Sequence, residues 1–132
     1  MIVVDANIIT YLVIQSDKTP MAERVIEKDS DWRAPLLWRS EMLNVLAFYM
    51  RNAAMSAGAA QATFEMARAA VNGELVVEAA KVLELVSLTR CSSYDCEYVA
   101  AAQSLRVPLV TADKKLLTAF PDIAVSMEKF TL

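Results

Sequence analysis

Four acidic residues occupy positions at which carboxylates could do chemistry together: Asp5, Glu41, Asp95 and Asp113. They offer hard oxygen ligands, which suit Mg²⁺ or Mn²⁺ better than zinc or copper. Carboxylates within ion-pair distance repel one another, so such a cluster either binds cations or keeps some protons at neutral pH. A bound divalent ion can lower the pKa of a water molecule for in-line attack on a phosphodiester. The four acids therefore predict one acidic metal site.

Three of these acids also have a purely structural interpretation. Asp5 and Asp113 each follow a predicted strand and precede a predicted helix, where aspartate is a preferred N-cap. Asp95 falls in the first turn of a predicted helix, where the macrodipole stabilises a negative charge by about 0.3–1 kcal/mol. For these three residues, helix stabilisation and metal binding both stay open.

Glu41 is harder to explain as a structural residue. On a helix, its neighbours about one or two turns away form a largely apolar stripe made of Leu37, Trp38, Asn44, Val45 and Phe48. A charge buried there costs several kcal/mol unless it is paired. Arg39 and Arg51 do not share this face closely, so an ion pair would need a partner from elsewhere in the fold. A metal ion or a shared polar pocket is the better account.

The chain contains no histidine and two cysteines, Cys91 and Cys96. Without histidine there is no Ser-His-Asp or Cys-His catalysis and no imidazole metal ligand. Two cysteines are too few for a disulfide framework or a zinc set, so we expect them to be reduced and structural. Hydrolytic chemistry would have to come from carboxylates, lysines, hydroxyls or a metal.

The elements that must position the acids follow from hydrophobic periodicity and from helix start and stop signals. Strands are predicted at 2–5, 32–35, 108–113 and 121–127. Helices are predicted at 6–15, 20–28, 36–53, 59–72, 79–90, 94–107 and 114–120. Pro20 suits the start of its helix, Ser92 and Ser93 form a cap-like start, and Gly73 is well placed as a C-terminal cap.

The alternation of strands and helices predicts an α/β fold. Right-handed crossovers between strands produce a mostly parallel sheet with helices on both faces. Ligands in such sheets collect at the carboxyl ends of the strands. Asp5 and Asp113 are each at the predicted end of a strand, so we expect them at this edge of the sheet.

Length and composition favour one hydrophobic core. The chain has 132 residues, of which 56% are hydrophobic, with only two glycines and four prolines. This is near the commonest size of a single domain, so we predict one domain over residues 1–132. We expect the methionines, Trp32 and Trp38 in its core, with a dimer patch as the alternative for these residues. Apolar segments stop short of the roughly 18 uncharged residues of a membrane span, and Asp5 falls too early for a signal peptide. We therefore expect a cytoplasmic protein with no membrane partner.

The net charge of −3 has the wrong sign for a protein that holds nucleic acid by a broad basic surface. Taken alone, it counts against a nucleic-acid partner. The objection weakens if part of the acidity is a carboxylate cluster neutralised by divalent cations, because the bound ion then attracts phosphate.

Around the four acids, the sequence resembles the PIN-domain nucleases and, within them, the VapC-type toxins of toxin–antitoxin pairs. The resemblance rests on VVDANIITYLV around Asp5, LLWRSEMLNVL around Glu41, SSYDCEYVAAAQSLRVPLVTAD from Asp95 to Asp113, and the following KKLL. It implies a three-layer α/β/α fold and a Mg²⁺- or Mn²⁺-dependent endoribonuclease, a hydrolase that cuts single-stranded RNA. It also implies a homodimer inhibited by a cognate antitoxin whose tail covers the site.

The resemblance also implies roles for individual residues. Asp5, Asp95 and Asp113 would hold the metal, and Glu41 would complete the catalytic site, often through water. Asn7 and Thr111 match polar positions that often line such sites and contact substrate. Each of these two could equally be a strand-end or turn residue that bonds the backbone.

Other charged residues near the predicted site have simpler interpretations. Glu97 follows Asp95 by two residues, which turns it away by about 200° on a helix, so we expect a solvated side chain. Lys114 and Lys115 could meet phosphate at the mouth of the site, although lysines at such positions are more often ordinary surface residues.

The sequence lacks residues that several rival functions require. A receiver-type phosphoacceptor needs an aspartate at the end of a middle strand, and none occurs between Asp31 and Asp95. A haloacid-dehalogenase-like phosphatase needs a second aspartate where the chain has Asn7. A nucleotide-binding fold requires a glycine-rich loop after its first strand, and no such loop follows Asp5. Two alternatives stay open: an inactive PIN-like scaffold that binds RNA or protein, and a housekeeping RNA-processing nuclease.

Overall fold

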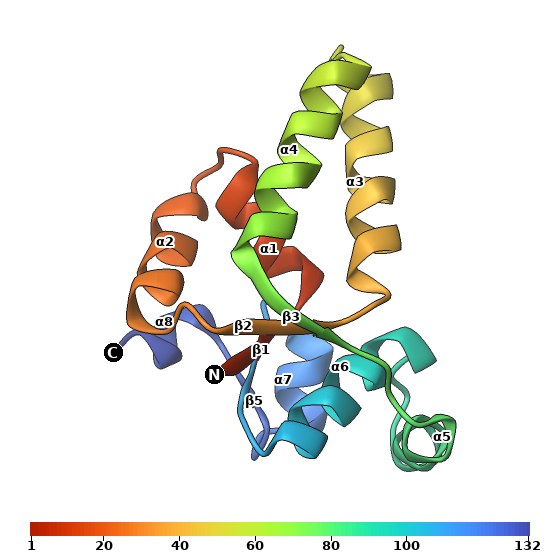
Figure 1. Cartoon of the computed structure of the whole chain (residues 1–132). Helices are drawn as coiled ribbons and strands as arrows, with labels where there is room; N and C mark the ends of the chain where they lie inside the picture. The colour runs from red at the N-terminus through yellow and green to blue at the C-terminus, as the bar shows by residue number, and fades with distance from the viewer.

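The computed structural model describes residues 1–132 and contains one five-stranded sheet in which every neighbouring pair is parallel (Figure 1). The strand order is β3-β2-β1-β4-β5. The bounds of the strands are β1 Ile2–Val4, β2 Trp32–Pro35, β3 Val71–Leu75, β4 Leu109–Val110 and β5 Ala124–Val125. The predicted parallel α/β sheet is therefore confirmed.

Helices cover both faces of the sheet. Their bounds are α1 Ala6–Val13, α2 Thr19–Lys28, α3 Trp38–Asn52, α4 Ala57–Ala70, α5 Ala79–Leu88, α6 Ser93–Leu105, α7 Lys114–Ala119 and α8 Met127–Phe130. In Figure 1, α1, α3 and α4 lie above the sheet, and α5, α6 and α7 lie below it. Helices α2 and α8 pack on each other beside α1. This arrangement confirms the expected three-layer α/β/α fold.

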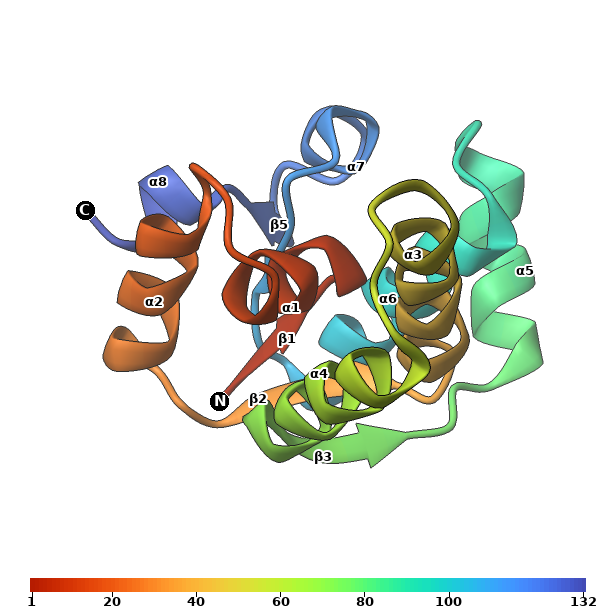
Figure 2. The ribbon, with the colours of Figure 1, turned by 90° about the horizontal axis from the view of Figure 1, so that it is seen from above.

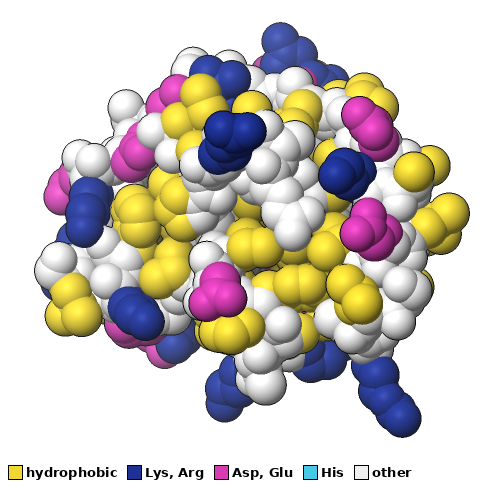
Figure 3. Space-filling model, turned by 90° about the horizontal axis from the view of Figure 1, so that it is seen from below, with side chains coloured by type: hydrophobic (Ala, Val, Ile, Leu, Met, Phe, Trp, Pro, Cys, Tyr) yellow, Lys and Arg dark blue, Asp and Glu magenta, His cyan; other side chains and the backbone are white.

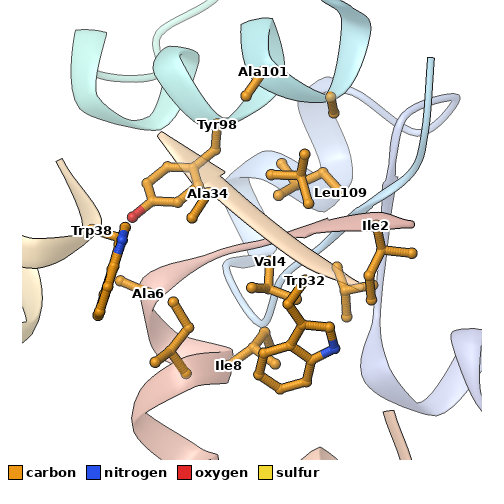
Figure 4. Close-up of a cluster of buried hydrophobic side chains, with 14 of the residues drawn as sticks. Ile2, Val4, Ala6, Ile8, Trp32, Ala34, Trp38, Tyr98, Ala101 and Leu109 are labelled. Carbon is orange, nitrogen blue, oxygen red and sulfur yellow. The ribbon is translucent and has the colours of Figure 1, made fainter. Parts of the chain in front are cut away.

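The middle strand, β1, is apolar because it is covered on both faces. Ile2, Val3 and Val4 are all buried, as expected for a strand inside a parallel sheet. Figure 4 shows Ile2 and Val4 beside Trp32, with Leu109 from the neighbouring strand. The indole nitrogen of Trp32 is buried and has no hydrogen-bond partner. The core thus forms around β1, which sets the position of Asp5 directly after it.

The core expectations are confirmed for the tryptophans and cysteines and only in part for the methionines. Trp32 and Trp38 are fully buried, and Cys91 and Cys96 are buried free thiols. The expectation for the methionines was wrong for several of them, since Met42 and Met127 are buried while Met50 and Met66 are exposed. None of the helices combines the length and the apolar character that a bilayer-crossing segment requires.

The prediction for Gly73 was wrong. The helix expected at 59–72 ends at Ala70, and Gly73 lies inside β3, a strand that the sequence pattern did not predict. In the sheet Gly73 pairs with Arg33 of β2, and a Cβ added to Gly73 would lie 2.8 Å from Cδ of Arg33. Pairing with β2 therefore overrides the local pattern, and the glycine allows the close approach of a side chain.

The end of the chain also differs from expectation. The strand predicted at 121–127 is reduced to Ala124–Val125, and the short helix α8 follows at once. Ser126 caps α8, because its hydroxyl accepts a hydrogen bond from the backbone N–H of Lys129 at 3.1 Å. A serine cap at this position was available in the sequence as a helix start signal.

Ser92 is expected to stabilise α6, the helix that carries Asp95. Its hydroxyl accepts a hydrogen bond from the backbone N–H of Asp95 at 3.1 Å, which confirms the predicted cap. Ser92→Ala should lower the free energy of unfolding by about 1 kcal/mol, measured by urea denaturation. Ser93→Ala is the matched control, because no hydrogen bond of the Ser93 side chain occurs in the structure; an equal loss in both variants would contradict the cap.

Candidate active site

The carboxyl ends of β1 and β4 bring two of the predicted acids to one edge of the sheet. Chain connections run from β1 outward to β2 and β3 on one side and to β4 and β5 on the other, so the strand order reverses between β1 and β4. Such a reversal opens a crevice at the strand ends. Asp5 continues the ladder, since its backbone N–H donates to the carbonyl of Val110 at 3.0 Å. Asp113 follows Val110 by three residues.

Helix starts supply the other two acids. Glu41 lies in the first turn of α3 and Asp95 in the first turn of α6, while Asp5 and Asp113 are the N-cap residues of α1 and α7. Figure 2 shows α1, α3, α6 and α7 as neighbours around this end of the molecule. The positive ends of four helix dipoles therefore favour negative groups at this edge.

The four acids line one open cavity of about 390 Å³. The remaining lining residues are Ala6, Asn7, Thr10, Tyr11, Asn44 and Val45. A second cavity, of about 180 Å³ between α5, α6 and the segment before α5, contains the acid Glu78 and the base Lys81. The structure thus brings all four predicted acids to a single cavity, and the chemistry of the lining distinguishes it from the smaller one.

Asp5 is held by a small polar network. The hydroxyl of Thr111 donates to Oδ2 of Asp5 at 2.7 Å, and Nδ2 of Asn7 lies 3.4 Å from the same oxygen. Asn7 also accepts a hydrogen bond from the backbone N–H of Ala112 at 3.3 Å, and Thr111 accepts one from that of Asp113 at 3.0 Å. Asn7 and Thr111 therefore lie beside Asp5 and connect the ends of β1 and β4.

The predicted role of a helix cap is confirmed for Asp113 but not for Asp5. Asp5 occupies the N-cap position of α1, but its side chain makes no capping hydrogen bond. Asp113 does cap α7, because Oδ1 accepts a hydrogen bond from the backbone N–H of Lys115 at 2.8 Å. Asp113 thus stabilises a helix and lines the cavity at the same time.

Burial changes the acidity of Asp5. The side chain is only 8% exposed, and burial raises its pKa from 3.8 to about 6. The hydrogen bond from Thr111 opposes the rise, whereas the negative charges of Glu41 and Asp95 add to it. A cation at this position would offset both the burial and the repulsion, because it favours the ionised carboxylate.

Glu41 has a different environment from the one predicted. The buried face of α3 consists of Trp38, Met42 and Leu46, and Phe48 is 60% exposed, so Glu41 lies half-buried beside the core stripe and not within it. No ion pair involves Glu41, and Arg39 pairs with Glu74 instead. The proposed polar-pocket account fits better than the ion-pair account.

A tyrosine that the sequence analysis did not select is the partner of Glu41. The phenol of Tyr98 donates a hydrogen bond to Oε1 of Glu41 at 2.6 Å. Burial raises the pKa of Glu41, and this hydrogen bond and the charge of Asp95 act in opposite directions on it. Burial and the contact with Glu41 raise the pKa of Tyr98, so the phenol keeps its proton. Its position three residues after Asp95, on the same helical face, was the available signal.

The charged residues next to the predicted site are arranged as follows. Lys114 and Lys115 are exposed at the start of α7. Glu97 is half-buried, and burial raises its pKa, so the prediction of a solvated side chain was only partly correct. The negative charge of Glu97 also raises the pKa of Glu41, although burial is the larger cause.

The carboxylate oxygens that line the cavity are the type of ligand that a hard divalent cation prefers. Every acidic group at the cavity is a carboxylate oxygen donor, as Mg²⁺ and Mn²⁺ prefer, and neither cysteine nor histidine competes. No three acidic or cysteine side chains of the chain converge closely enough to surround one ion as they stand. The fit therefore rests on the oxygen donors and on the raised pKa of Asp5, which burial causes first and repulsion from Glu41 and Asp95 increases.

Loss of the Thr111 hydroxyl is expected to destabilise the protein. Thr111→Val keeps the shape but removes the donor to Asp5 and the acceptor for the Asp113 N–H. Asp5 would lose its nearest donor, and the half-buried N–H of Asp113 would lose its acceptor, which should lower the free energy of unfolding by about 1–3 kcal/mol at pH 7 in chelator. Denaturant unfolding measures the change. Thr118→Val, at an exposed position of α7, is the matched control, and similar behaviour of both variants would contradict the network.

Comparison with known proteins supports the observed arrangement. The family model described as PIN domain matches residues 2–123. The structure resembles that of PAE2754 from Pyrobaculum aerophilum, with a TM-score of 0.79, 21% identity, and coverage of 98% of this chain and 91% of that one. It also resembles a chain of a toxin–antitoxin complex from Klebsiella pneumoniae, with a TM-score of 0.72, 19% identity, and coverage of 96% and 98%. No curated protein sequence matches significantly.

Proposed function

Because the chain belongs to the PIN domain family, we propose that it is a metal-dependent endoribonuclease that hydrolyses RNA phosphodiester bonds. The observation that carries this proposal is the convergence of Asp5, Glu41, Asp95 and Asp113 on one cavity at the strand-order reversal. PIN domains are generally nucleases, which supports phosphodiester hydrolysis as the reaction class.

The four acids are the proposed ligands of Mg²⁺ or Mn²⁺. When bound, the ion would lower the pKa of a water molecule and neutralise charge that develops on the phosphate. Because no three acids converge on a point, we expect side-chain rearrangement or bridging water when the ion binds. Repulsion from Glu41 and Asp95 on the buried Asp5 supports a cation at this position.

Neighbouring groups would orient the ligands and the substrate. The hydroxyl of Thr111 and the amide of Asn7 hold Asp5 in one position. Helix N-termini at the cavity favour the phosphate of the substrate. We propose that the exposed Lys114 and Lys115, which follow Asp113 directly, approach phosphate at the mouth of the cavity.

The surface charge is in keeping with local recognition of phosphate. The net charge is −3, and the face in Figure 3 carries scattered Lys and Arg side chains among acidic and hydrophobic ones, with no continuous basic surface. Broad electrostatic contact with the RNA backbone would need such a surface. Binding is therefore expected to depend on the metal and on contacts near the cavity.

A cleavage assay tests the proposed activity. Purified protein is incubated with a pool of single-stranded and structured RNAs in Mg²⁺, Mn²⁺ or chelator. We expect cutting with either metal, none in chelator, and none by Asp95→Asn, while Asp17→Asn at an exposed loop position cuts normally. Equal cutting by wild type and Asp95→Asn would contradict this site. RNA binding without cutting under every condition would favour the inactive scaffold.

We further propose that the chain is a toxin that forms a homodimer and is inhibited by a cognate antitoxin. Its likeness to a chain of a toxin–antitoxin complex supports a protein partner. Helices α3 and α4 also leave an apolar groove of about 270 Å³, lined among others by the exposed Leu43 and Met50. Exposed apolar grooves of this kind are typical of protein interfaces.

Two observations test the partner proposals. Co-expression with the product of an adjacent small DNA-binding gene should suppress cleavage and yield a complex of the two proteins. Failure of every adjacent gene product to bind would favour a housekeeping nuclease. Light scattering should give the mass of a dimer, and a monomer at high concentration would contradict the homodimer.

A further inference from the structure

The contact between Tyr98 and Glu41 joins two helices at the site. Tyr98 comes from α6 and Glu41 from α3, 57 residues apart in the sequence, and the phenol donates to Oε1 of Glu41 at 2.6 Å. Figure 4 shows the ring of Tyr98 over Ala34 with its hydroxyl directed toward Trp38, at the beginning of α3. Tyr98 is 1% exposed, so its position is set by packing.

The two partners differ in their freedom to move. A buried aromatic ring has two side-chain torsions and sits in a packed surrounding, whereas glutamate has three torsions and Glu41 is half-buried. Ordering a side chain rich in rotamers costs entropy, and a fixed neighbour can reduce that cost at the moment of binding. The rigid phenol therefore restricts the carboxylate, and the carboxylate has little effect on the ring.

The geometry leaves part of the carboxylate available. The phenol is the one hydrogen-bond donor to Glu41 and contacts only Oε1, so no hydrogen bond occupies Oε2. Asp95 lies three residues before Tyr98, and residues three apart share a helical face. Helix α6 thus presents one acid of the cavity directly and restrains a second acid through the tyrosine.

From this arrangement we propose that Tyr98 is a positioning residue, which holds Glu41 in the orientation that completes the metal site. The inference rests on the proposed function and adds a residue to it. In the alternative, structural interpretation, Glu41 merely satisfies a buried hydroxyl. The two interpretations differ in whether loss of the hydroxyl changes metal binding.

Removal of the hydroxyl tests the inference. Tyr98→Phe keeps the ring and deletes the donor, and Tyr94→Phe, exposed on the same helix, is the matched control. We expect Tyr98→Phe to weaken Mn²⁺ binding about tenfold, the lower end of the effect typical for groups that orient metal ligands, with a normal affinity for Tyr94→Phe. Titration calorimetry or Mn²⁺ paramagnetic resonance measures the affinity, and a thermal melt checks folding.

A double-mutant cycle identifies the route of the effect. In a Glu41→Ala background, Tyr98→Phe should cause no further loss of Mn²⁺ affinity, because the group it orients is gone. Unchanged Mn²⁺ affinity in Tyr98→Phe, or a full additional loss in the Glu41→Ala background, would overturn the inference. A lower melting temperature with unchanged affinity would establish the structural interpretation instead.

Cleavage measurements separate this inference from the proposed function. If the protein is a nuclease, Tyr98→Phe should lower kcat while the KM for RNA stays near that of wild type. If the wild-type protein cuts no RNA but Tyr98→Phe still binds Mn²⁺ more weakly than wild type, the positioning role is supported and the nuclease proposal is contradicted. If cleavage requires Asp95, but Tyr98→Phe changes neither cleavage nor Mn²⁺ affinity, the nuclease proposal is supported and the positioning role is contradicted.

Discussion

Asp5→Asn is expected to reduce metal-dependent RNA cleavage by a factor of about 100 to 1,000. The substitution keeps the size of the side chain and an oxygen for the Thr111 hydroxyl, but it removes the negative charge from the most buried of the four acids. Stabilisation of charge by a metal is worth several kcal/mol, and each 1.4 kcal/mol corresponds to about tenfold in rate. Initial rates at saturating Mn²⁺ measure the effect.

The control for this prediction is Asp122→Asn, at an exposed position away from the cavity. It should cut RNA at the wild-type rate. Mn²⁺ binding should fall in Asp5→Asn together with the rate, and a thermal melt in chelator should show a folded protein. Wild-type cleavage by Asp5→Asn would contradict the proposed role of Asp5 and direct attention to contaminating nuclease.

In the absence of metal, Asp5 is expected to make the wild-type protein less stable as pH rises from its ordinary pKa of 3.8 to its folded-state pKa of about 6. Burial and neighbouring charges raise the pKa of Asp5 to about 6, against 3.8 for an ordinary aspartate. Below pH 3.8 the group is protonated in both states. Between these values the unfolded chain releases the proton while the folded chain keeps it, so unfolding becomes easier. The loss contributed by Asp5 reaches about 3 kcal/mol above pH 6.

Comparison with Asp5→Asn isolates this contribution. Asp31 and Glu74 have lowered pKa values, so their ionisation changes stability in the opposite direction, whereas Glu41 and Glu97 have raised values and act in the same direction as Asp5. Both proteins contain these four groups, so the difference between the two pH curves reports on Asp5. In chelator, Asp5→Asn should match wild type near pH 4 and exceed it by about 3 kcal/mol at pH 7.5. Saturating Mg²⁺ should recover stability in wild type only. Parallel pH curves for the two proteins would show that burial does not disfavour the charge of Asp5.

Local signals in the sequence were sufficient for much of the fold. The β-branched run before Asp5 predicts a strand, Pro20 predicts a helix start, and Ser92 predicts a cap, because each of these depends on neighbours along the chain. The strand β3 escaped prediction since Gly73 resembles a helix end in sequence. Only the neighbouring strand β2, with Arg33 opposite Gly73, reveals the need for a glycine there.

For the site, too, some features could be predicted from the sequence and others could not. The sequence alone determined which acids are candidates, since strand ends and helix starts can be read from periodicity, and parallel strands place their carboxyl ends at one edge. Only the tertiary structure decided that Glu41 faces Tyr98 and not an arginine, and that Asp5 is buried with Thr111. Hydrogen bonds between residues far apart in the chain, and the pKa shifts that burial causes, depend on how the layers pack, which one-dimensional patterns do not encode.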